Sequence, residues 1–192
     1  MKKELVLASG SPRRQQMMRD VGYEFAVRNL DIDESFGDMP APEVAEFLAK
    51  KKNAACRAML QDEVIVTADT VVVHDGKILG KPVDEKEACE MIKAMSAQEH
   101  QVISAVCISD GEKSLSYSDE VVVTMMPLSK EEIEFYVKQF QPMDKAGAYG
   151  IQEWIGMVGV EKISGSFYSV VGMPIHWVYK SLKDNFGIFP NQ

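Results

Sequence analysis

The sequence predicts an α/β protein built around a mixed, twisted sheet, and two observations carry this prediction. Short apolar runs alternate with amphipathic stretches of helical period, which is typical of βα units with parallel strands. Asp-Gly pairs at 75–76 and 110–111 each lie between two strand-like runs, and such pairs indicate antiparallel hairpins. A chain that combines both arrangements requires a sheet that is neither purely parallel nor purely antiparallel.

The size and charge of the chain narrow its class. Its 192 residues can bury a sizeable core, and no linker, repeat or low-complexity segment divides them, so we predict a single domain over 1–192. The formal charge of −8 argues against duplex nucleic acid or an anionic membrane as a partner. No apolar run approaches the ~20 residues that span a bilayer. The first apolar run, which ends at Ala8, is too short for a signal peptide.

The three cysteines are widely spaced and fall in predicted helices and strands. Their spacing fits neither a disulfide framework nor a zinc site, so they are expected to be reduced core thiols. We therefore expect the protein to be cytoplasmic.

The first strand and helix surround the tripeptide Ser9-Gly-Ser. Residues 5–8 predict a buried strand, Ser11 an N-cap, Pro12 the first helical residue, and Gly22 the helix stop. A helix N-terminus favours an anion, whereas Arg13 and Arg14 in the first turn oppose the helix dipole unless something negative lies beside them. The stretch is therefore either an anion site or an ordinary βα turn with a solvated arginine pair.

A second strand is expected over 23–29, followed by an acidic loop at 31–34. That loop is either a solvated turn or the source of a carboxylate for a divalent metal. A long helix is predicted from Pro42 to about Leu60, with apolar residues along one face. Lys50, Lys51 and Lys52 lie in its middle and point in three directions, so at most one or two of them can reach a common site.

The run 64–73 is the most strand-like in the sequence, and Asp69 and Thr70 interrupt its apolar character. A carboxylate there is costly unless it is paired, bound to a metal or at an exposed strand end. Perturbed carboxylates cluster at functional sites, so a functional role is favoured over an aspartate satisfied by backbone N–H groups. Ligands of α/β sheets bind at the carboxyl ends of strands, where the sequence places Ser9–Arg14 and Asp69-Thr70.

The second half of the chain is predicted from caps and turns. Asp84 with Glu87, and Ser129 with Glu132, open helices that end near Met95 and before Pro142. Residues 144–152 are too irregular for helix or strand. Strands are expected over 101–109, 114–126, 155–163 and 167–171, and a final helix from Pro174 to about Asn185.

The sequence lacks a phosphate loop, a Gly-x-Gly-x-x-Gly motif and a Gly-x-Ser-x-Gly elbow. What remains is a set of polar and cationic residues at predicted turns, with one carboxylate: Ser9, Arg13, Arg14, Lys52, Lys81 and Asp69. A nucleoside triphosphate carries several negative charges. Three or four local cations with a metal ion could cradle it, even in an acidic protein.

Five segments, in order, resemble the Maf family of nucleoside triphosphate pyrophosphatases: Leu7–Arg14, Ala68–Thr70, Gly80–Pro82, Ala146–Gln152 and Gly165–Pro174. The similarity covers nearly the whole chain. It implies hydrolysis of the α–β phosphoanhydride to a nucleoside monophosphate and pyrophosphate, with a divalent cation such as Mg²⁺ or Mn²⁺. It also implies an elongated two-lobed fold like that of inosine triphosphate pyrophosphatases, with the active site in the cleft, and a homodimer.

The resemblance also implies roles for individual residues. Asp69 matches the residue that accepts the proton of the attacking water. Glu34, together with Asp69, matches a position that binds the metal ion or a water molecule. The phosphate-cleft positions are Ser9, Arg13, Arg14, Lys52 and Lys81. Arg13, Thr70 and Gln152 match positions for base selectivity in the branch that acts on dTTP and UTP. A primary amide both donates and accepts, so Gln152 could pair with a thymine or uracil ring.

These observations predict a metal-dependent pyrophosphatase of dTTP and UTP, with modified pyrimidine nucleotides as further substrates. The alternative is a non-catalytic nucleotide-binding regulator of septum formation or cell division. Consumption of far more than one nucleotide per chain distinguishes the enzyme from the regulator.

Overall fold

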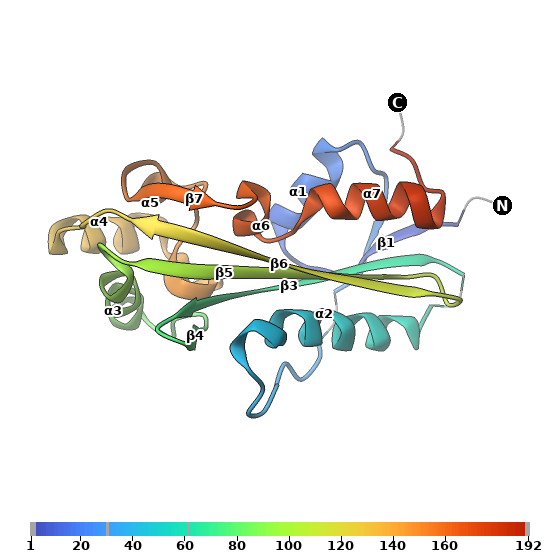
Figure 1. Ribbon diagram of the computed structural model, residues 1–192, viewed down its shortest axis with the longest axis horizontal. Helices are drawn as coiled ribbons and strands as arrows, with labels where there is room; N and C mark the ends of the chain where they lie inside the picture. Colours follow the sequence, from blue (N-terminus) through green and yellow to red (C-terminus); the bar gives the residue numbers. More distant parts are fainter. Residues whose placement is uncertain (1–2, 30, 61, 191–192) are drawn as a thin grey trace. The chain divides into compact units, whose positions relative to one another are not determined.

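The computed structural model describes residues 3–29, 31–60 and 62–190 and confirms the α/β class (Figure 1). The described strands form one seven-stranded sheet in the order β2-β1-β3-β5-β6-β7, with β4 paired to β3. The strands are β1 (Leu5–Leu7), β2 (Ala26–Val27), β3 (Val64–His74), β4 (Lys77–Leu79), β5 (Glu99–Ser109), β6 (Ser114–Met125) and β7 (Val160–Ser164). β1 pairs in parallel with β2 and β3, whereas β3–β4 and β6–β7 are antiparallel, so the predicted mixed sheet is confirmed.

The helices begin largely where the caps predict. They are α1 (Pro12–Asp20), α2 (Ala41–Arg57), α3 (Glu85–Met95), α4 (Lys130–Phe140), α5 (Trp154–Val158), α6 (Phe167–Val171) and α7 (Ile175–Phe186), with 3₁₀ turns η1 (Pro142–Asp144) and η2 (Ala146–Ala148). The Asp84 side chain accepts from the Glu87 N–H, and Ser129 and Glu132 form a reciprocal capping box. No helix of the described chain is long and apolar enough to cross a membrane.

Contacts group the chain into two compact units. Unit 1 comprises residues up to 69, 104–119 and those from 172 onward, and unit 2 comprises 70–103 and 120–171. β3, β5 and β6 each run from one unit into the other, since their residue ranges include these boundaries. That the whole chain acts as one domain stays a prediction.

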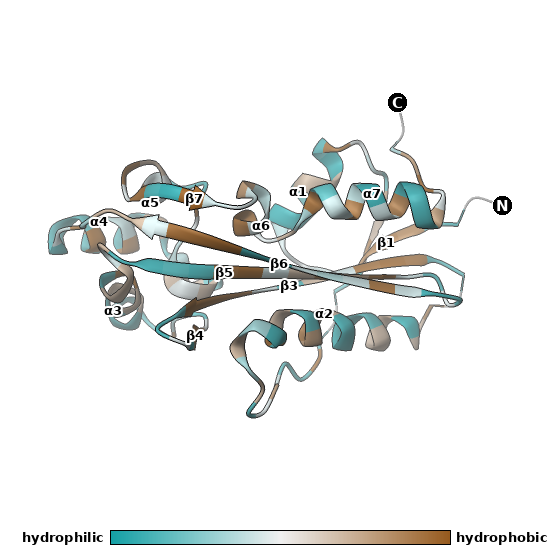
Figure 2. Ribbon diagram, viewed as in Figure 1, coloured by the Kyte–Doolittle hydropathy of each residue, from teal (hydrophilic) through white to brown (hydrophobic). Residues whose placement is uncertain are grey.

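In unit 1, α2 covers one face of the strands, and α1 and α7 lie on the other (Figure 1). Buried polar contacts fix α2: Thr67 Oγ1 donates to the Ala49 carbonyl at 2.7 Å, and Asn53 Nδ2 to the Cys107 carbonyl at 3.1 Å. On the other face Trp177 of α7 stacks on Tyr117 of β6, with ring centroids 5.3 Å apart. In Figure 2 the strands combine apolar or neutral stretches with hydrophilic ones, such as the start of β5, and the helices are two-sided, as burial of one helix face requires.

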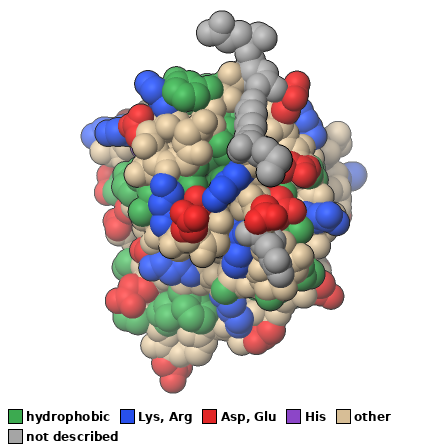
Figure 3. Space-filling model, turned by 90° about the vertical axis from the view of Figure 1, so that its right-hand side faces the viewer, with side chains coloured by type: hydrophobic (Ala, Val, Ile, Leu, Met, Phe, Trp, Pro, Cys, Tyr) green, Lys and Arg blue, Asp and Glu red, His purple; other side chains and the backbone are tan. Residues whose placement is uncertain are grey.

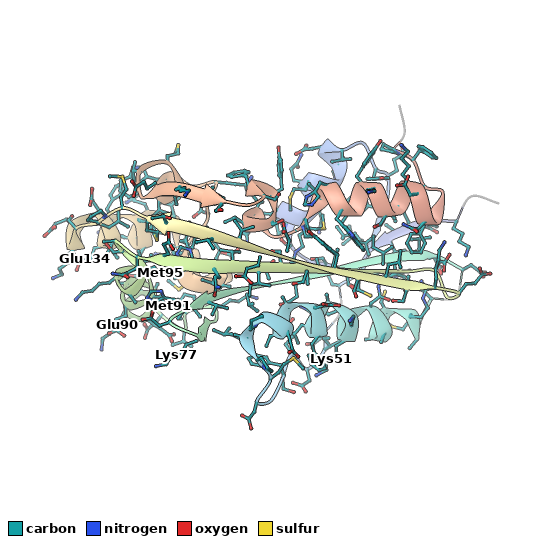
Figure 4. All side chains as sticks on the ribbon, viewed as in Figure 1. Lys51, Lys77, Glu90, Met91, Met95 and Glu134 are labelled. Carbon is teal, nitrogen blue, oxygen red and sulfur yellow. The ribbon has the colours of Figure 1, made fainter. Side chains whose placement is uncertain are left out.

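In unit 2, α3 and α4 pack against each other. Met95, labelled on α3 in Figure 4, is fully buried. The β3–β4 hairpin turns at Asp75 and Gly76, whose φ angles of 50° and 72° are both positive. The predicted Asp-Gly hairpin is therefore confirmed, with the backbone that such a turn requires.

Three predictions about strands need correction. Residues 155–163 and 167–171 are not continuous strands: the structure has α5, the shorter β7 and α6 there. The apolar residues of this segment also satisfy a helical spacing, and the Ser166 carbonyl accepts from the N–H groups of Ser169 and Val170, which starts α6. The strand predicted over 23–29 shrinks to Ala26–Val27, because its parallel partner β1 is itself only three residues long.

Candidate active site

The β1–α1 turn brings a buried serine to the start of a helix. Ser9 is 8% exposed, and its Oγ accepts from the Ser11 N–H at 3.3 Å. As predicted, α1 begins at Pro12 with Ser11 as N-cap, and Gly22 follows its end with a φ of 91°. Among the described residues, Ser11 makes no side-chain capping bond, so Ser9 is the hydroxyl that organises this turn.

Arg14 ties this turn to two other segments of unit 1. Its Nη1 donates to the Ala68 carbonyl at 2.8 Å, and its Nε to the Gly172 carbonyl at 2.9 Å. The paired part of β1 and β3 ends with Leu7 opposite Val66. The Ala68 carbonyl lies just beyond this point, and the guanidinium of Arg14 provides its hydrogen-bond donor. Nη1 also lies 3.4 Å from Ser9 Oγ. Arg14 therefore has a structural role in addition to the phosphate contact that the resemblance implies.

Asp69 lies in the interior of β3, which continues to His74, so its predicted place at the end of a strand is wrong. The prediction failed because β3 crosses from one unit into the other, which the local sequence pattern does not reveal. Asp69 does, however, lie three residues beyond Val66, the last β3 residue paired with β1. Its side chain is 11% exposed, so it is a largely buried carboxylate next to a strand end.

Lys52 satisfies this carboxylate. Its Nζ lies 2.5 Å from Asp69 Oδ1 and 2.8 Å from Glu34 Oε1, so two carboxylates meet at one ammonium group. Lys50 instead pairs with Glu46 at 2.5 Å. The three neighbouring lysines therefore point in different directions, as predicted, and Lys52 is the one that contacts Asp69.

Lys51, labelled in Figure 4, faces the acidic loop. Its Nζ lies 3.4 Å from Asp33 Oδ2 and donates to the Ser35 carbonyl at 3.1 Å. These contacts hold the loop that carries Glu34 against α2. The loop is thus neither a free turn nor a separate acidic site: it brings one carboxylate to Lys52.

Arg13 and Arg14 both interact electrostatically with the cluster around Asp69. Burial lowers the pKa of Arg14, the Asp69 carboxylate raises it, and Arg13 lowers it further. Glu34 also raises the pKa of Arg14. Six of the predicted site residues thus gather in unit 1: Ser9, Arg13, Arg14, Glu34, Lys52 and Asp69.

The carboxylates of Asp69 and Glu34 suit a divalent cation such as Mg²⁺ that is bound together with the substrate. The described residues contain no cluster of three or more His, Cys, Asp or Glu side chains that could hold a metal alone. Asp69 and Glu34 nevertheless converge on one point, now contacted by Lys52 Nζ. Mg²⁺ is commonly bound by one or two carboxylates together with substrate phosphates and water, so these two residues suit an ion that arrives with a phosphorylated substrate.

The other three predicted residues, Thr70, Lys81 and Gln152, belong to unit 2. Lys81 is exposed after β4, and the preceding Gly80 carbonyl accepts from the Gly147 N–H at 3.0 Å. The main chain of the Lys81 segment therefore contacts the segment that leads to Gln152. Thr70 is half-buried in β3.

Gln152 is exposed in a four-residue turn, closed by a 3.0 Å hydrogen bond from the Glu153 N–H to the Gly150 carbonyl. The preceding residue, Ile151, is 7% exposed. The turn therefore buries one side chain and presents the next, which is an arrangement suited to a residue that meets a ligand.

Sequence reasoning missed the polar partners of this turn. The Tyr136 hydroxyl, on fully buried Tyr136 of α4, donates to Glu153 Oε2 and accepts from the Gly150 N–H at 3.0 Å. Lys145, 8% exposed, pairs with Asp144 at 2.7 Å and with Glu153 at 3.0 Å. Tyr136 belongs to the buried face of α4, so its pattern indicates only a core aromatic, and no sequence signal pairs it with Glu153.

Charges on the surface are interspersed on the face shown in Figure 3. There the described Lys and Arg side chains lie among Asp and Glu side chains and form no broad area of one sign.

Comparisons with known proteins identify the family of the chain. Over 183 residues the chain is 46% identical to a "dTTP/UTP pyrophosphatase" of Bacteroides fragilis, covering 94% of this chain and 95% of the relative. It is 44% identical over 188 residues to a protein of the same name from Porphyromonas gingivalis, covering 95% and 94%. The solved Ham1 protein of Staphylococcus aureus aligns over 64% of this chain and 72% of that one, with 14% identity and a TM-score of 0.48. The family model described as "Maf-like protein" matches residues 4–185, and the chain therefore belongs to the Maf family.

Proposed function

We propose that this protein hydrolyses the α–β phosphoanhydride of dTTP and UTP, releasing a nucleoside monophosphate and pyrophosphate. The observation that carries the proposal is the meeting of Asp69, Glu34 and Lys52 beside the Ser9–Arg14 turn. The names of the two bacterial relatives, which share 46% and 44% identity over nearly their whole length, support the choice of substrate.

In this proposal the turn after β1 and the lysines hold the polyphosphate. Ser9, Arg13, Arg14, Lys52 and Lys81 would contact phosphate oxygens. Phosphoryl transfer depends on positioning and charge stabilisation more than on covalent chemistry, so a set of cations is what the reaction needs. Arg14 is already fixed by two backbone carbonyls, so it costs little additional ordering to bind.

Asp69 is assigned the role of general base. Its carboxylate, held in place by Lys52, would accept the proton of the attacking water. Asp69 and Glu34 would hold the divalent cation, Mg²⁺ or Mn²⁺, together with the substrate. When bound, such an ion supplies charge stabilisation and a lowered pKa of bound water.

Base selectivity is assigned to Arg13, Thr70 and Gln152. The exposed amide of Gln152 can donate to a ring carbonyl and accept from the adjacent N–H, which are both present in thymine and uracil. Modified pyrimidine nucleotides that keep this edge would be substrates for the same reason.

The setting of the enzyme is part of the proposal. Cys56, Cys89 and Cys107 are all free thiols, and burial raises the pKa of each. Cys56 and Cys107 are buried and Cys89 is half-buried, and unpaired thiols with raised pKa values suit a reducing cytoplasm. We also propose a homodimer and a nucleotide, rather than duplex nucleic acid or a membrane, as the partner.

The test is to incubate the full chain with Mg²⁺ or Mn²⁺ and each common triphosphate, and to identify both products. We expect pyrophosphate and monophosphate from dTTP and UTP, at many turnovers per chain. Release of single phosphates would overturn the assigned reaction. Binding with consumption of one nucleotide or less per chain would instead support the regulator.

A further inference from the structure

The turn that presents Gln152 is fastened at both ends by one buried hydroxyl. Tyr136 of α4 accepts from the N–H of Gly150, the first residue of the turn, at 3.0 Å. The same hydroxyl donates to the carboxylate of Glu153, the last residue of the turn. A phenol has one proton to donate and lone pairs to accept with, so these two contacts use its capacity in a fixed direction.

The carboxylate at the end of the turn is also held on its other side. Glu153 Oε1 lies 3.0 Å from the Nζ of Lys145, which is 8% exposed. Both Glu153 oxygens are therefore engaged by groups of unit 2, one by Lys145 and one by Tyr136. The cost of burying a lysine is met here by two carboxylates, Glu153 and Asp144.

The carboxyl group of Glu153 packs closely against Gly150. A Cβ at this residue would lie 2.8 Å from Glu153 Cδ, so the carboxyl group lies directly against the glycine backbone. The ring of Tyr136, by contrast, is fixed independently of its hydroxyl: it is fully buried and stacks on Phe140, with centroids 5.2 Å apart. The phenol oxygen is thus a rigid reference point to which the turn is attached.

We infer that Tyr136, acting through Gly150 and Glu153, is a positioning residue that sets the base selectivity of the enzyme. This inference rests on the proposed function, and specifically on Gln152 as the residue that contacts the base. Tyr136 does not contact the substrate itself. Its hydroxyl fixes the turn, so that the Gln152 amide meets a pyrimidine edge without first paying the entropy of ordering the loop.

The test compares Tyr136→Phe with Tyr23→Phe and with the parent chain. Each substitution removes one buried hydroxyl and keeps the ring. Tyr23 is 4% exposed, lies in unit 1, and its hydroxyl has no hydrogen-bond partner among the described residues. It therefore controls for the loss of a buried phenol oxygen that is unconnected to the turn.

We expect Tyr136→Phe to lower kcat/KM for dTTP by about three- to thirtyfold, mostly through KM, while kcat/KM for dGTP changes less than about twofold. Gln152→Ala should shift the ratio in the same direction, and Tyr23→Phe should leave it unchanged. Hydrogen exchange gives a readout besides activity: the Gly150 amide should exchange at least about tenfold faster in Tyr136→Phe.

Each outcome bears on the inference. An unchanged ratio of dTTP to dGTP in Tyr136→Phe, or equal losses for both, would overturn it even if the Gly150 amide exchanges faster. A second variant, Glu153→Asp, keeps the charge but shortens the reach to Tyr136 and Lys145, so it should shift the ratio in the same way if Tyr136→Phe folds poorly. Failure of the parent chain to release pyrophosphate at all would instead refute the proposed function.

Discussion

Asp69 lies in the interior of β3 between fully buried Ala68 and half-buried Thr70, and its carboxylate is held by Lys52 at 2.5 Å. If it accepts the proton of the attacking water, Asp69→Asn should lower kcat by about 10²- to 10⁴-fold, because an amide is no base. The fold should survive, since Lys52 keeps Glu34 as a partner at 2.8 Å. Pyrophosphate release and a thermal melt measure the two effects.

Asp33→Asn is the matched control for that substitution. Asp33 lies in the same acidic loop as Glu34, but its side chain is 74% exposed and pairs with Lys51 instead. Hydrogen bonds from the Ser35 hydroxyl and N–H are the main cause of its lowered pKa. The charge of Asp33 therefore stabilises the loop itself. Turnover close to that of the parent chain is expected for Asp33→Asn. The same result for Asp69→Asn would remove Asp69 from the role of base.

At the residue scale, the sequence predicts residue types better than partners. The rule that successive helical residues diverge correctly separated Lys50, Lys51 and Lys52. The same rule could not indicate that Asp69 and Glu34 both contact Lys52, because these contacts join residues 17 or more positions apart. Likewise, the bonds from Arg14 to the carbonyls of Ala68 and Gly172 span 54 and 158 positions, and no local pattern encodes them.

At the scale of elements, the 146–152 segment depends on a glycine that a larger residue cannot replace. Gly147 has a φ of 69°, and a Cβ there would lie 3.0 Å from Val72 Cγ1 of β3. Gly147→Ala should therefore combine left-handed strain with overpacking and cost about 2–4 kcal/mol of the free energy of unfolding. The shift in denaturant midpoint measures this cost.

Gly187→Ala separates the cost of the left-handed backbone from the cost of the close contact with Val72. Gly187 follows α7 with a nearly identical φ of 66°, but nothing lies within 4 Å of its Cβ position. It should cost only about 1 kcal/mol, the backbone part. In a double-mutant cycle, Val72→Ala and Gly147→Ala together should cost less than the sum of their separate costs, because Val72→Ala removes the methyl groups that the added Cβ would crowd. Equal costs for the two glycines would show that contact with Val72 contributes nothing.

Cap signals were more reliable than apolar runs in predicting the elements. Asp84 and Ser129 start helices where their side chains accept the expected N–H groups. Such caps are local hydrogen bonds, so a few residues suffice to specify them. The apolar residues of 155–171 fit both periods, and only packing in unit 2 decides that β7 is flanked by α5 and α6.

At the scale of the molecule, the sequence predicted the mixed sheet but not the division of labour between units. Ser9, Arg13, Arg14, Glu34, Lys52 and Asp69 fall in unit 1, and Thr70, Lys81 and Gln152 in unit 2. The boundary passes between Asp69 and Thr70, within a single strand that reads as one continuous run. Under the roles proposed above, Asp69 and most of the phosphate-binding residues fall in unit 1, and two of the three base-reading residues, Thr70 and Gln152, fall in unit 2. This division depends on long-range contacts.

The stability of the whole molecule should depend on the protonation of one buried histidine. His100 is 2% exposed, its Nε2 lies 2.7 Å from the Tyr149 hydroxyl, and burial lowers its pKa to about 4. In the unfolded chain a histidine titrates near ~6.5, so between these values only the unfolded state binds the proton. The free energy of unfolding should therefore fall as pH falls from about 6.5 to 4, by roughly 3 kcal/mol from this group.

The contribution of His100 can be isolated by difference, because carboxylates that titrate in the same window are common to all variants. His100→Gln removes the titrating ring and keeps a polar group that can reach Tyr149. Its stability should therefore fall less steeply with pH than that of the parent chain, as denaturant unfolding at several pH values would measure. If the His100→Gln curve is parallel to the parent, then His100 is not protonated on unfolding, and its burial does not set the acid limit of the fold.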